Sequence, residues 1–406
     1  MIPIVQSAIT ILLFIFILGA LVLIHELGHF VTARWAKVRV LEFGIGFPPR
    51  AKVLGRGKPE PLDLERPATP PALPPGMEPG SAEALAFLEV AEQIETDRGG
   101  TLYTLNWLPI GGFVKLEGED GDAANDPRSF ARARLPIKMG ILIAGVTMNL
   151  LLAFAIFTGI ALWGEPAIGV TIGTVSPGSP ADEVGLVAGD TIVTLDGAQY
   201  SAFGARGAVT SDLLAHAGQT VTLGVLHADG TTEQITVTLR VPTAQQAGAL
   251  GISSRVGIEV GTINYTIPEA IKLGAQRTVD AFGLILGGLA DLGRSIVTNP
   301  TTAPPASGPV GIAVELGDVL WGLGPLYVLY LAGLLSANLA LVNILPFPPL
   351  DGGRMLVILL KAVPRYGTRI SLRAEQLTYA VGFVALFTFL IWITVFDIAK
   401  QVSGTP

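Results

Sequence analysis

The chain has 406 residues, of which half are hydrophobic and 15% are charged, and its net charge is −7. Soluble proteins average about 25% charged residues, so the composition indicates a membrane protein. Lysine and arginine do not form the dense basic surface that nucleic-acid binding requires, and we expect no nucleic-acid partner. Cysteine is absent, which excludes disulfides, thiolate metal sites and cysteine nucleophiles. A metal would therefore be bound by carboxylates and by histidines, of which there are four.

The first segment, residues 1–24, has no charged side chain and exceeds the about 20 residues needed to cross a bilayer. A removable signal peptide is the alternative, but the segment has no positively charged start and no Ala-x-Ala cleavage site. We therefore assign residues 1–56 to a first transmembrane helix and the start of a loop. Residues 57–100 contain a Pro- and Ala-rich stretch and then a short helical pattern at 81–96, which together predict a solvated linker insert.

Residues 101–137 begin with two apolar runs of strand-forming residues on either side of Pro109–Gly112, a pattern that predicts a β-hairpin. The hairpin is more apolar than an ordinary loop, so we expect it to reach toward the membrane. Irregular backbone at that depth is tolerated only where protein or a water-filled cavity satisfies its polar groups.

Three further segments, 138–164, 319–353 and 376–396, each contain a charge-free stretch long enough to span. Residues 166–242 alternate strand-like runs with Gly- and Pro-containing turns, which predicts a small β-rich domain. The sequence therefore predicts a polytopic α-helical membrane protein with four transmembrane helices, a membrane-associated β-hairpin and an inserted β-rich domain.

Residues 266–298 show an amphipathic helical pattern in the last third of the chain. Their uncharged core, 281–290, is too short to span a bilayer. We expect this helix to lie along the membrane surface.

Lysine and arginine are concentrated after the first span, before the second, and between the third and fourth. Loops rich in these residues remain in the cytoplasm. Both termini and residues 165–318 are then expected on the outer side of the membrane.

A zinc-protease pattern, His25-Glu26-Leu27-Gly28-His29, ends the first apolar segment. Helical residues four apart lie on one face, so His25 and His29 can bind one zinc ion. Glu26 is then placed to act as general base on the water that zinc activates. The alternative is that the histidines are interfacial anchors and Glu26 pairs with Arg34. Burying such polar residues at the end of a span is costly unless they have a function.

A catalytic zinc site requires a third protein ligand, and Asp351 is the candidate. His216 and His227 fall within the outward β-rich domain, on the wrong side of the membrane. Asp351 follows prolines that end the third span, and this span runs in the same direction as the first. Asp351 and His25 are therefore expected at the same depth. The alternative is that Asp351 is a turn or N-cap residue.

Three amides, Asn149, Asn338 and Asn343, interrupt apolar segments. Hydrogen bonding between helices accounts for such residues. Asn343 lies close to Asp351 in sequence and could instead hold a substrate strand or polarise the scissile carbonyl. Both interpretations of Asn343 stay open.

Several motifs in one order carry a resemblance that covers most of the chain. They are His25–Phe30, Phe43–Phe47, Leu108–Lys115, Ser179–Ala181 with Gly185–Asp190, Gly308–Ala313, and Asn343–Gly353. With these motifs the chain resembles the site-2 proteases, and among them the bacterial regulator-of-sigma-E type with an inserted PDZ domain.

The resemblance implies that His25, His29 and Asp351 are the zinc ligands and that Glu26 is the catalytic base. It also implies that the hairpin is a membrane-re-entrant loop that binds substrate as an added strand. The substrate-binding residues expected there are Gly111, Gly112, Phe113 and Val114. Residues 166–242 resemble a PDZ domain, which in this family acts as a gate or size filter and could contact a peptide or protein.

The activity implied is that of a zinc-dependent intramembrane endopeptidase in the bacterial inner membrane, with its active site toward the cytoplasm. Its expected substrates are single-pass membrane proteins, such as trimmed anti-sigma factors or remnant signal peptides. Three features depart from the family: room for one PDZ domain rather than two, Val146 where a proline is usual, and the Pro-rich insert. The rival functions are a non-catalytic PDZ membrane scaffold and a metal carrier or sensor.

Overall fold

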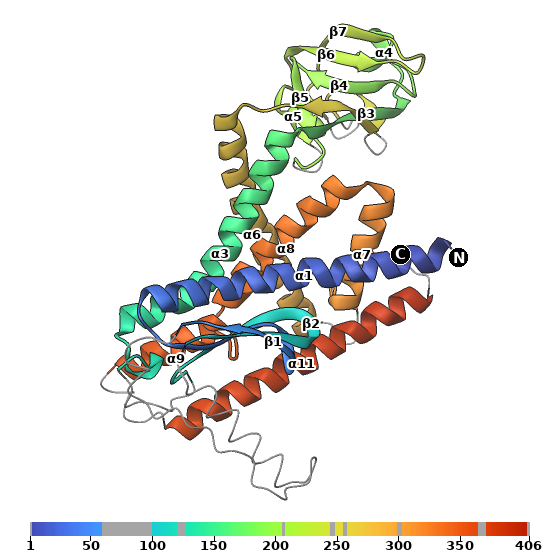
Figure 1. Cartoon of the computed structure of the whole chain (residues 1–406). Coiled ribbons are helices and arrows are strands. Elements are labelled where there is room, and N and C mark those ends of the chain that lie inside the picture. The colour runs from blue at the N-terminus through green and yellow to red at the C-terminus, as the bar shows by residue number, and fades with distance from the viewer. Residues whose placement is uncertain are drawn as a thin grey trace, which may run out of the picture. The chain divides into compact units, whose positions relative to one another are not determined.

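The computed structural model describes residues 2–58, 100–119, 127–204, 208–243, 248–254, 258–298, 303–363 and 371–403. Most of the expected linker and all of the expected 81–96 helix lie outside these ranges. The chain divides into two units (Figure 1). One contains Met1–Ile156 and Gln276–Pro406, and the other contains Phe157–Ala275.

Five helices within the described ranges are long and apolar enough to cross a membrane. They are α1 (Ile2–Trp35), α3 (Leu135–Trp163), α6 (Ile267–Thr298), α8 (Pro325–Ile344) and α11 (Leu372–Ser403). Large apolar side chains such as Phe16 on α1 and Phe383 on α11 are more than half exposed. In a bilayer such side chains contact lipid, because a helix satisfies its own backbone and can expose an apolar surface there.

The count of candidate spans is one higher than the sequence predicts, and the additional helix is α6. Its longest uncharged stretch is ten residues, which is why the sequence predicts a helix on the membrane surface. The helix itself runs for 32 residues, and an 18-residue window within it carries at most two charged residues. By length and composition, α6 therefore belongs with the candidate spans.

The expected third span, 319–353, covers the end of one helix, the whole of a second and the start of a third. After α7 (Pro309–Gly322), Gly324 adopts a φ of +102°, a left-handed conformation that favours glycine, and α8 follows. Proline-containing backbone then separates the end of α8 from α9 (Asp351–Ala362). The buried Asp397 of α11 accepts a hydrogen bond from the backbone N–H of Gly311 at 2.8 Å, which fixes the first turn of α7.

Strands β1 (Val40–Arg56) and β2 (Leu102–Leu116) pair with each other, and both are bent. Residues 42–45 of β1 are flanked on both sides, by 112–115 and by 102–105 of β2. Residues 50–56 pair with 102–106. Residues 112–116 therefore lie at an edge: among the strands that the structure describes, they pair only with the first part of β1.

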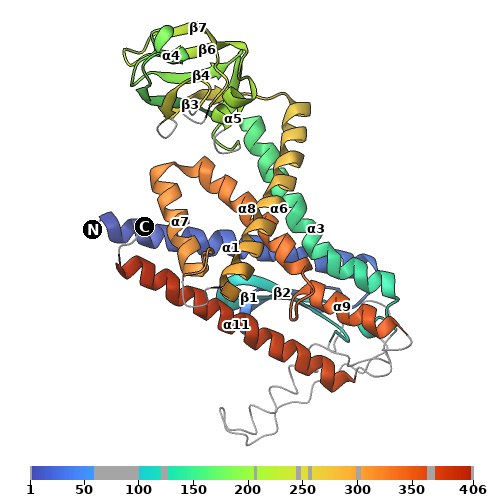
Figure 2. The same cartoon turned by 180° about the vertical axis from the view of Figure 1, so that it is seen from behind.

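The expectation of a hairpin confined to 101–118 is wrong in its pairing, because part of β1 lies between the two runs. The pair of strands lies between α1 and α11 in both views (Figures 1 and 2). It packs against α1, and an ion pair between Arg39 and Glu117, 2.7 Å apart and almost fully buried, ties the start of β1 to the end of β2.

The second unit is a β-rich domain around one apolar core. Its strands are β3 (Glu165–Val175), β4 (Thr191–Leu195), β5 (Ala198–Ser201), β6 (Thr220–Leu226), β7 (Thr232–Thr238), β8 (Ile252–Ser254) and β9 (Ile258–Ile263), with short helices α4 (Pro180–Glu183) and α5 (Ala208–Ala215). The sheet order is β7-β6-β4-β5-β3-β8, and β9 also pairs with β3. Because β8 and β9 belong to this sheet, the domain extends beyond the expected boundary at residue 242.

Candidate metal centre

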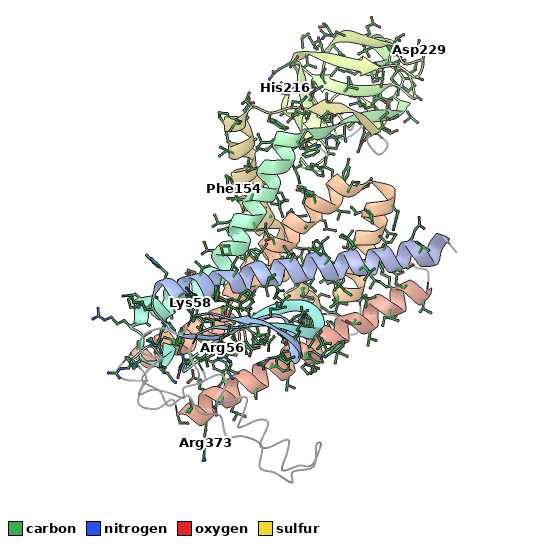
Figure 3. The ribbon with its side chains drawn as sticks, in the orientation of Figure 1. Arg56, Lys58, Phe154, His216, Asp229 and Arg373 are labelled. Carbon is green, nitrogen blue, oxygen red and sulfur yellow. The ribbon has the colours of Figure 1, made fainter. Side chains whose placement is uncertain are left out.

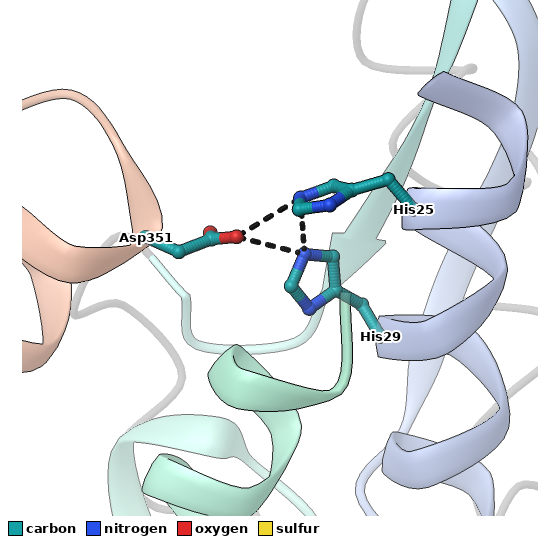
Figure 4. A group of neighbouring side chains, drawn as sticks. All are labelled: His25, His29 and Asp351. Atoms are coloured by element: carbon teal, nitrogen blue, oxygen red, sulfur yellow. Dashed lines mark hydrogen bonds and ion pairs between the residues drawn. The ribbon is translucent and has the colours of Figure 1, made fainter. Parts of the chain in front are cut away.

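Three side chains from distant parts of the sequence converge on one point (Figure 4). His25 and His29 project from neighbouring turns of α1, with their Nε2 atoms 3.2 Å apart. Asp351, the first residue of α9, places Oδ2 at 3.0 Å from Nε2 of His25 and at 3.2 Å from Nε2 of His29. The structure thus brings together the three residues that the sequence predicts as ligands.

These three donors fit a zinc ion. Two ligands each about 2.1 Å from a tetrahedral zinc lie about 3.4 Å apart, close to the separations found between the donor atoms. Nitrogen from histidine and oxygen from aspartate are both zinc ligands, and a three-residue set leaves a fourth position open. Within the described residues this is the only such group of histidine and carboxylate side chains.

Hydrogen bonding prepares His29 for metal binding. Its Nδ1 donates to the backbone carbonyl oxygen of Ile141 on α3, at 2.8 Å. The proton therefore lies on Nδ1, and the lone pair of Nε2 points toward His25 and Asp351. Both imidazole side chains are at most one-tenth exposed, so the surrounding packing holds the rings in place.

Glycines bring α3 close enough to α1 to make this contact. A Cβ atom at Gly145 would lie 2.5 Å from Nε2 of His29 and 2.8 Å from Cε1 of His25. A Cβ atom at Gly28 would collide with the carbonyl oxygen of Ala144. The backbones of the two helices therefore touch at the level of the histidines, and only glycine fits at these two positions.

Asp351 is positioned by a sharp turn at the start of α9. A Cβ atom at Gly352 would collide with the carbonyl oxygen of Ile344, and one at Gly353 would lie 2.6 Å from the Phe347 carbonyl carbon. The two glycines thus let the chain fold back onto the end of α8. This close approach fixes the position of Asp351 at the start of α9.

A cavity of about 650 Å³ opens beside the three donors. Glu26 lines it, together with Asn343 from α8 and with Phe113 and Val114 from the edge of β2. Gly111 and Gly112 are not among its lining residues. They pack against α1 instead, where a Cβ at Gly111 would lie 2.8 Å from Cγ1 of Val22.

The sequence-based prediction leaves out several residues of this site, among them Gly145, Glu119 and Arg354. Gly145 has no side chain that would collide with the imidazole rings. Arg354 lines the cavity one turn after Asp351. Arg354 could be found from the sequence, since residues three apart on a helix lie on the same face. Gly145 could not, because the approach of two helices depends on their packing.

The two remaining histidines belong to the β-rich domain. His216 follows α5 (Figure 3), and its Nδ1 donates to the carbonyl oxygen of Asp212 at 2.7 Å. His227 pairs with Asp190 at 2.9 Å. Neither belongs to the metal-binding group, in agreement with the sequence argument.

Comparison with known proteins agrees with this geometry. The model of peptidase family M50 matches residues 13–57 and 89–389, which is well over half of the chain. The zinc metalloprotease RasP of Geobacillus kaustophilus is 27% identical over 98% of this chain and 99% of its own length. A relative from Clostridium acetobutylicum is 28% identical over 98% of this chain and the whole of its own length.

Solved structures of isolated PDZ domains are similar to part of the chain. The PDZ domain of an SdrC-like protein from Listeria monocytogenes is 25% identical over 21% of this chain and 86% of its own, with a TM-score of 0.19. The corresponding domain from Listeria innocua covers 23% of this chain and 99% of its own, at 22% identity and the same TM-score.

Proposed function

Because the chain belongs to peptidase family M50 and is a multi-pass zinc metalloprotease, we propose that it cleaves the transmembrane segments of single-pass membrane proteins. One observation carries the proposal. Asp351 meets His25 and His29 beside a cavity that is lined by candidate membrane spans and by a strand edge. A site built in this way suits a peptide chain that enters from the bilayer.

Glu26 is the general base of this reaction. Its carboxylate lines the cavity next to both histidines, where it takes a proton from the attacking water and passes it to the leaving nitrogen. Zinc, when bound by the three donors, would polarise the scissile carbonyl and lower the pKa of water to about 7. The three ligand side chains are only slightly exposed, and electrostatic interactions in such surroundings are stronger than in bulk water.

The edge of β2 holds the substrate in an extended conformation. A transmembrane helix has no free backbone donors, so it must unwind before its peptide bonds can react. Residues 112–115 pair only with β1 among the described strands, so their outer side can accept an added strand, and Phe113 and Val114 line the same cavity as Glu26. Asn343, on the wall formed by α8, is placed to hydrogen-bond to the bound backbone.

The proposal extends to the orientation of the chain in the membrane and to the β-rich domain. The lysines and arginines near the metal centre lie on the cytoplasmic side of a bacterial inner membrane. The β-rich domain is a PDZ domain on the outer side, where it filters substrates by size or binds a peptide. Trimmed anti-sigma factors and remnant signal peptides, which are single-pass segments with small outer parts, are the expected substrates.

Reconstitution in lipid tests the reaction. We expect the purified chain to cleave a model single-pass substrate, and we expect Glu26→Gln to abolish cleavage while keeping zinc, since Glu26 is not a ligand. A PDZ scaffold without activity would bind partners equally well with Gln at this position. Equal cleavage by both proteins would overturn the proposal.

Metal exchange separates the protease from a metal carrier or sensor. A carrier predicts that zinc leaves and returns rapidly and that no substrate is cut. The protease predicts slow exchange, because three nearly buried ligands and the packed helices around them must move together. Following the loss of zinc to a chelator over time gives this measurement.

A further inference from the structure

Arg354 is the only lysine or arginine among the described residues that line the metal cavity. The acids of the same cavity are Glu26, Glu119 and Asp351. Glu26 and Asp351 are needed for catalysis and for binding the metal. The cavity therefore contains one cationic side chain that the proposed reaction does not use.

Arg354 is held by Glu119, which follows the end of β2. Nη1 of Arg354 donates to Oε1 of Glu119. The other carboxylate oxygen of Glu119 accepts a hydrogen bond from the backbone N–H of Leu116 at 3.2 Å. The guanidinium also lies 5.9 Å from the ring of Tyr379, over its face. The side chain of Arg354 is about one-third exposed and that of Glu119 is one-fifth exposed, so neither is sealed off.

A second cavity, of about 480 Å³, lies on the other side of this ion pair. It shares Glu119, Leu142 and Arg354 with the metal cavity, and its other lining residues include Lys138 and Lys361. The ion pair thus belongs to the wall between two open spaces. The guanidinium can reach a ligand in either of them while Glu119 stays anchored to β2.

We propose that Arg354 binds the carboxylate end of a cleaved peptide by exchanging it for Glu119. The ligand class is a peptide with a free C-terminal carboxylate, and the inference rests on the proposed function. Hydrolysis breaks the C–N bond, and the carbonyl carbon gains the oxygen of water while the nitrogen gains a proton. After proton transfer the two products carry a carboxylate and an ammonium group where the substrate carried a neutral amide.

The exchange costs little because one carboxylate replaces another. An unpaired charge in such a cavity is expensive, so Arg354 needs Glu119 as its partner while no product is present. Arginine binds carboxylates through two parallel N–H donors, so a mobile product carboxylate that aligns with both donors can compete with Glu119, which the backbone N–H of Leu116 also holds. Glu119, once released, is available to the new ammonium group.

Binding of a matched pair of peptides tests this inference. The probes are a fluorescein-labelled Ala-Leu-Ala-Leu-Ala peptide with a free C-terminal carboxylate and the same peptide with a C-terminal carboxamide. Their affinities for the zinc-loaded full chain in detergent are measured by fluorescence anisotropy. The wild-type protein should prefer the carboxylate. Charge-assisted hydrogen bonds contribute enough to make this preference about tenfold.

Two variants break the same ion pair but have opposite expected effects. Glu119→Gln removes the internal competitor, so the preference for the carboxylate should rise about tenfold. Arg354→Gln removes the binding group, so the preference should disappear while the zinc content stays at the wild-type level. Arg354→Lys keeps the charge without the two parallel donors and should give an intermediate value, which guards against misfolding of the Gln variant.

The outcomes separate the possible explanations. If both Gln variants shift the preference in the same direction, the pair has only a structural role and the inference is overturned. A preference that survives in Arg354→Gln would assign carboxylate binding to zinc alone and would also overturn it. If the wild-type protein shows the expected binding pattern but cuts no transmembrane substrate, the proposed function fails and the carboxylate site stands.

Discussion

Gly145 of α3 lies directly against the imidazole of His29 on α1, so that a Cβ atom at position 145 would stand 2.5 Å from Nε2. The metal centre therefore depends on a residue that binds nothing itself. We expect Gly145→Ala to displace the ring of His29 and to lower the zinc content measured by elemental analysis. Catalytic activity should fall in proportion to the bound zinc.

The control for this prediction is on the same helix. Gly140 also belongs to α3, but a Cβ atom there would meet nothing within 4 Å. Gly140→Ala should therefore keep both zinc and activity, since alanine favours helix slightly over glycine. Equal zinc content in the two variants would show that the helices can move apart without loss of the site.

Asp351 supplies the third ligand from a separate element, so its removal should affect the metal before anything else. Asp351→Ala should reduce zinc occupancy to a small fraction of the wild-type value, because a two-histidine site is left incomplete. Asn343→Ala is the matched variant, since Asn343 lines the same cavity without belonging to the metal-binding group. It should keep its zinc and slow cleavage. Full occupancy in Asp351→Ala would mean that another residue completes the site.

The strand edge can be tested by removing a backbone donor. Along a strand, successive N–H groups point to opposite sides, so one of Phe113 and Val114 donates toward β1 and the other toward the free edge. Proline at the outward-facing position should slow cleavage severalfold and leave zinc unchanged. Alanine at the same position keeps the donor and is the control. Equal rates for the proline and alanine variants would argue against substrate binding at this edge.

The β-rich domain should show its own pH dependence through His227. The hydrogen bond to the carboxylate of Asp190, at 2.9 Å, raises the pKa of His227 above its usual value. Since the folded state holds the proton more tightly, the stabilisation is complete below about pH 6.5 and fades as the pH rises through the raised pKa. Hydrogen exchange of β4 and β6 should therefore distinguish His227→Gln from wild type at pH 6 and much less at pH 9. A difference that grows with pH would contradict this assignment.

Much of the metal centre follows from the sequence because few residue types can form it. With cysteine absent, His25 and His29 need a carboxylate as third ligand, and Asp351 is the candidate that the sequence predicts. Alternating patterns and turn residues within 166–242 predict the β-rich domain, although β8 and β9 lie beyond that range. The His25–His29 spacing and the strand patterns are local, so a short window of sequence predicts them.

Features that depend on pairing between distant segments cannot be predicted from a short window of sequence. Strand β1 contains glycine, two prolines and several basic residues, a composition that does not predict a strand. It forms because β2, over forty residues later, pairs with it on two sides. The bounds of α6 agree with the helix expected at 266–298, but the sequence does not identify it as a candidate span, because charged residues limit its uncharged core to ten residues.

Under the proposed function, the outer side of residues 112–115, which no described strand covers, has a consequence for the choice of substrates. Backbone hydrogen bonds are the same for almost every residue, so an edge that recognises main chain places few demands on the side chains of its ligand. Substrates would then be distinguished by how readily their transmembrane helix unwinds. Glycine, proline and β-branched residues promote unwinding. Two substrates with unrelated sequences but equally weak helices would be cut alike, and a polyleucine span would resist.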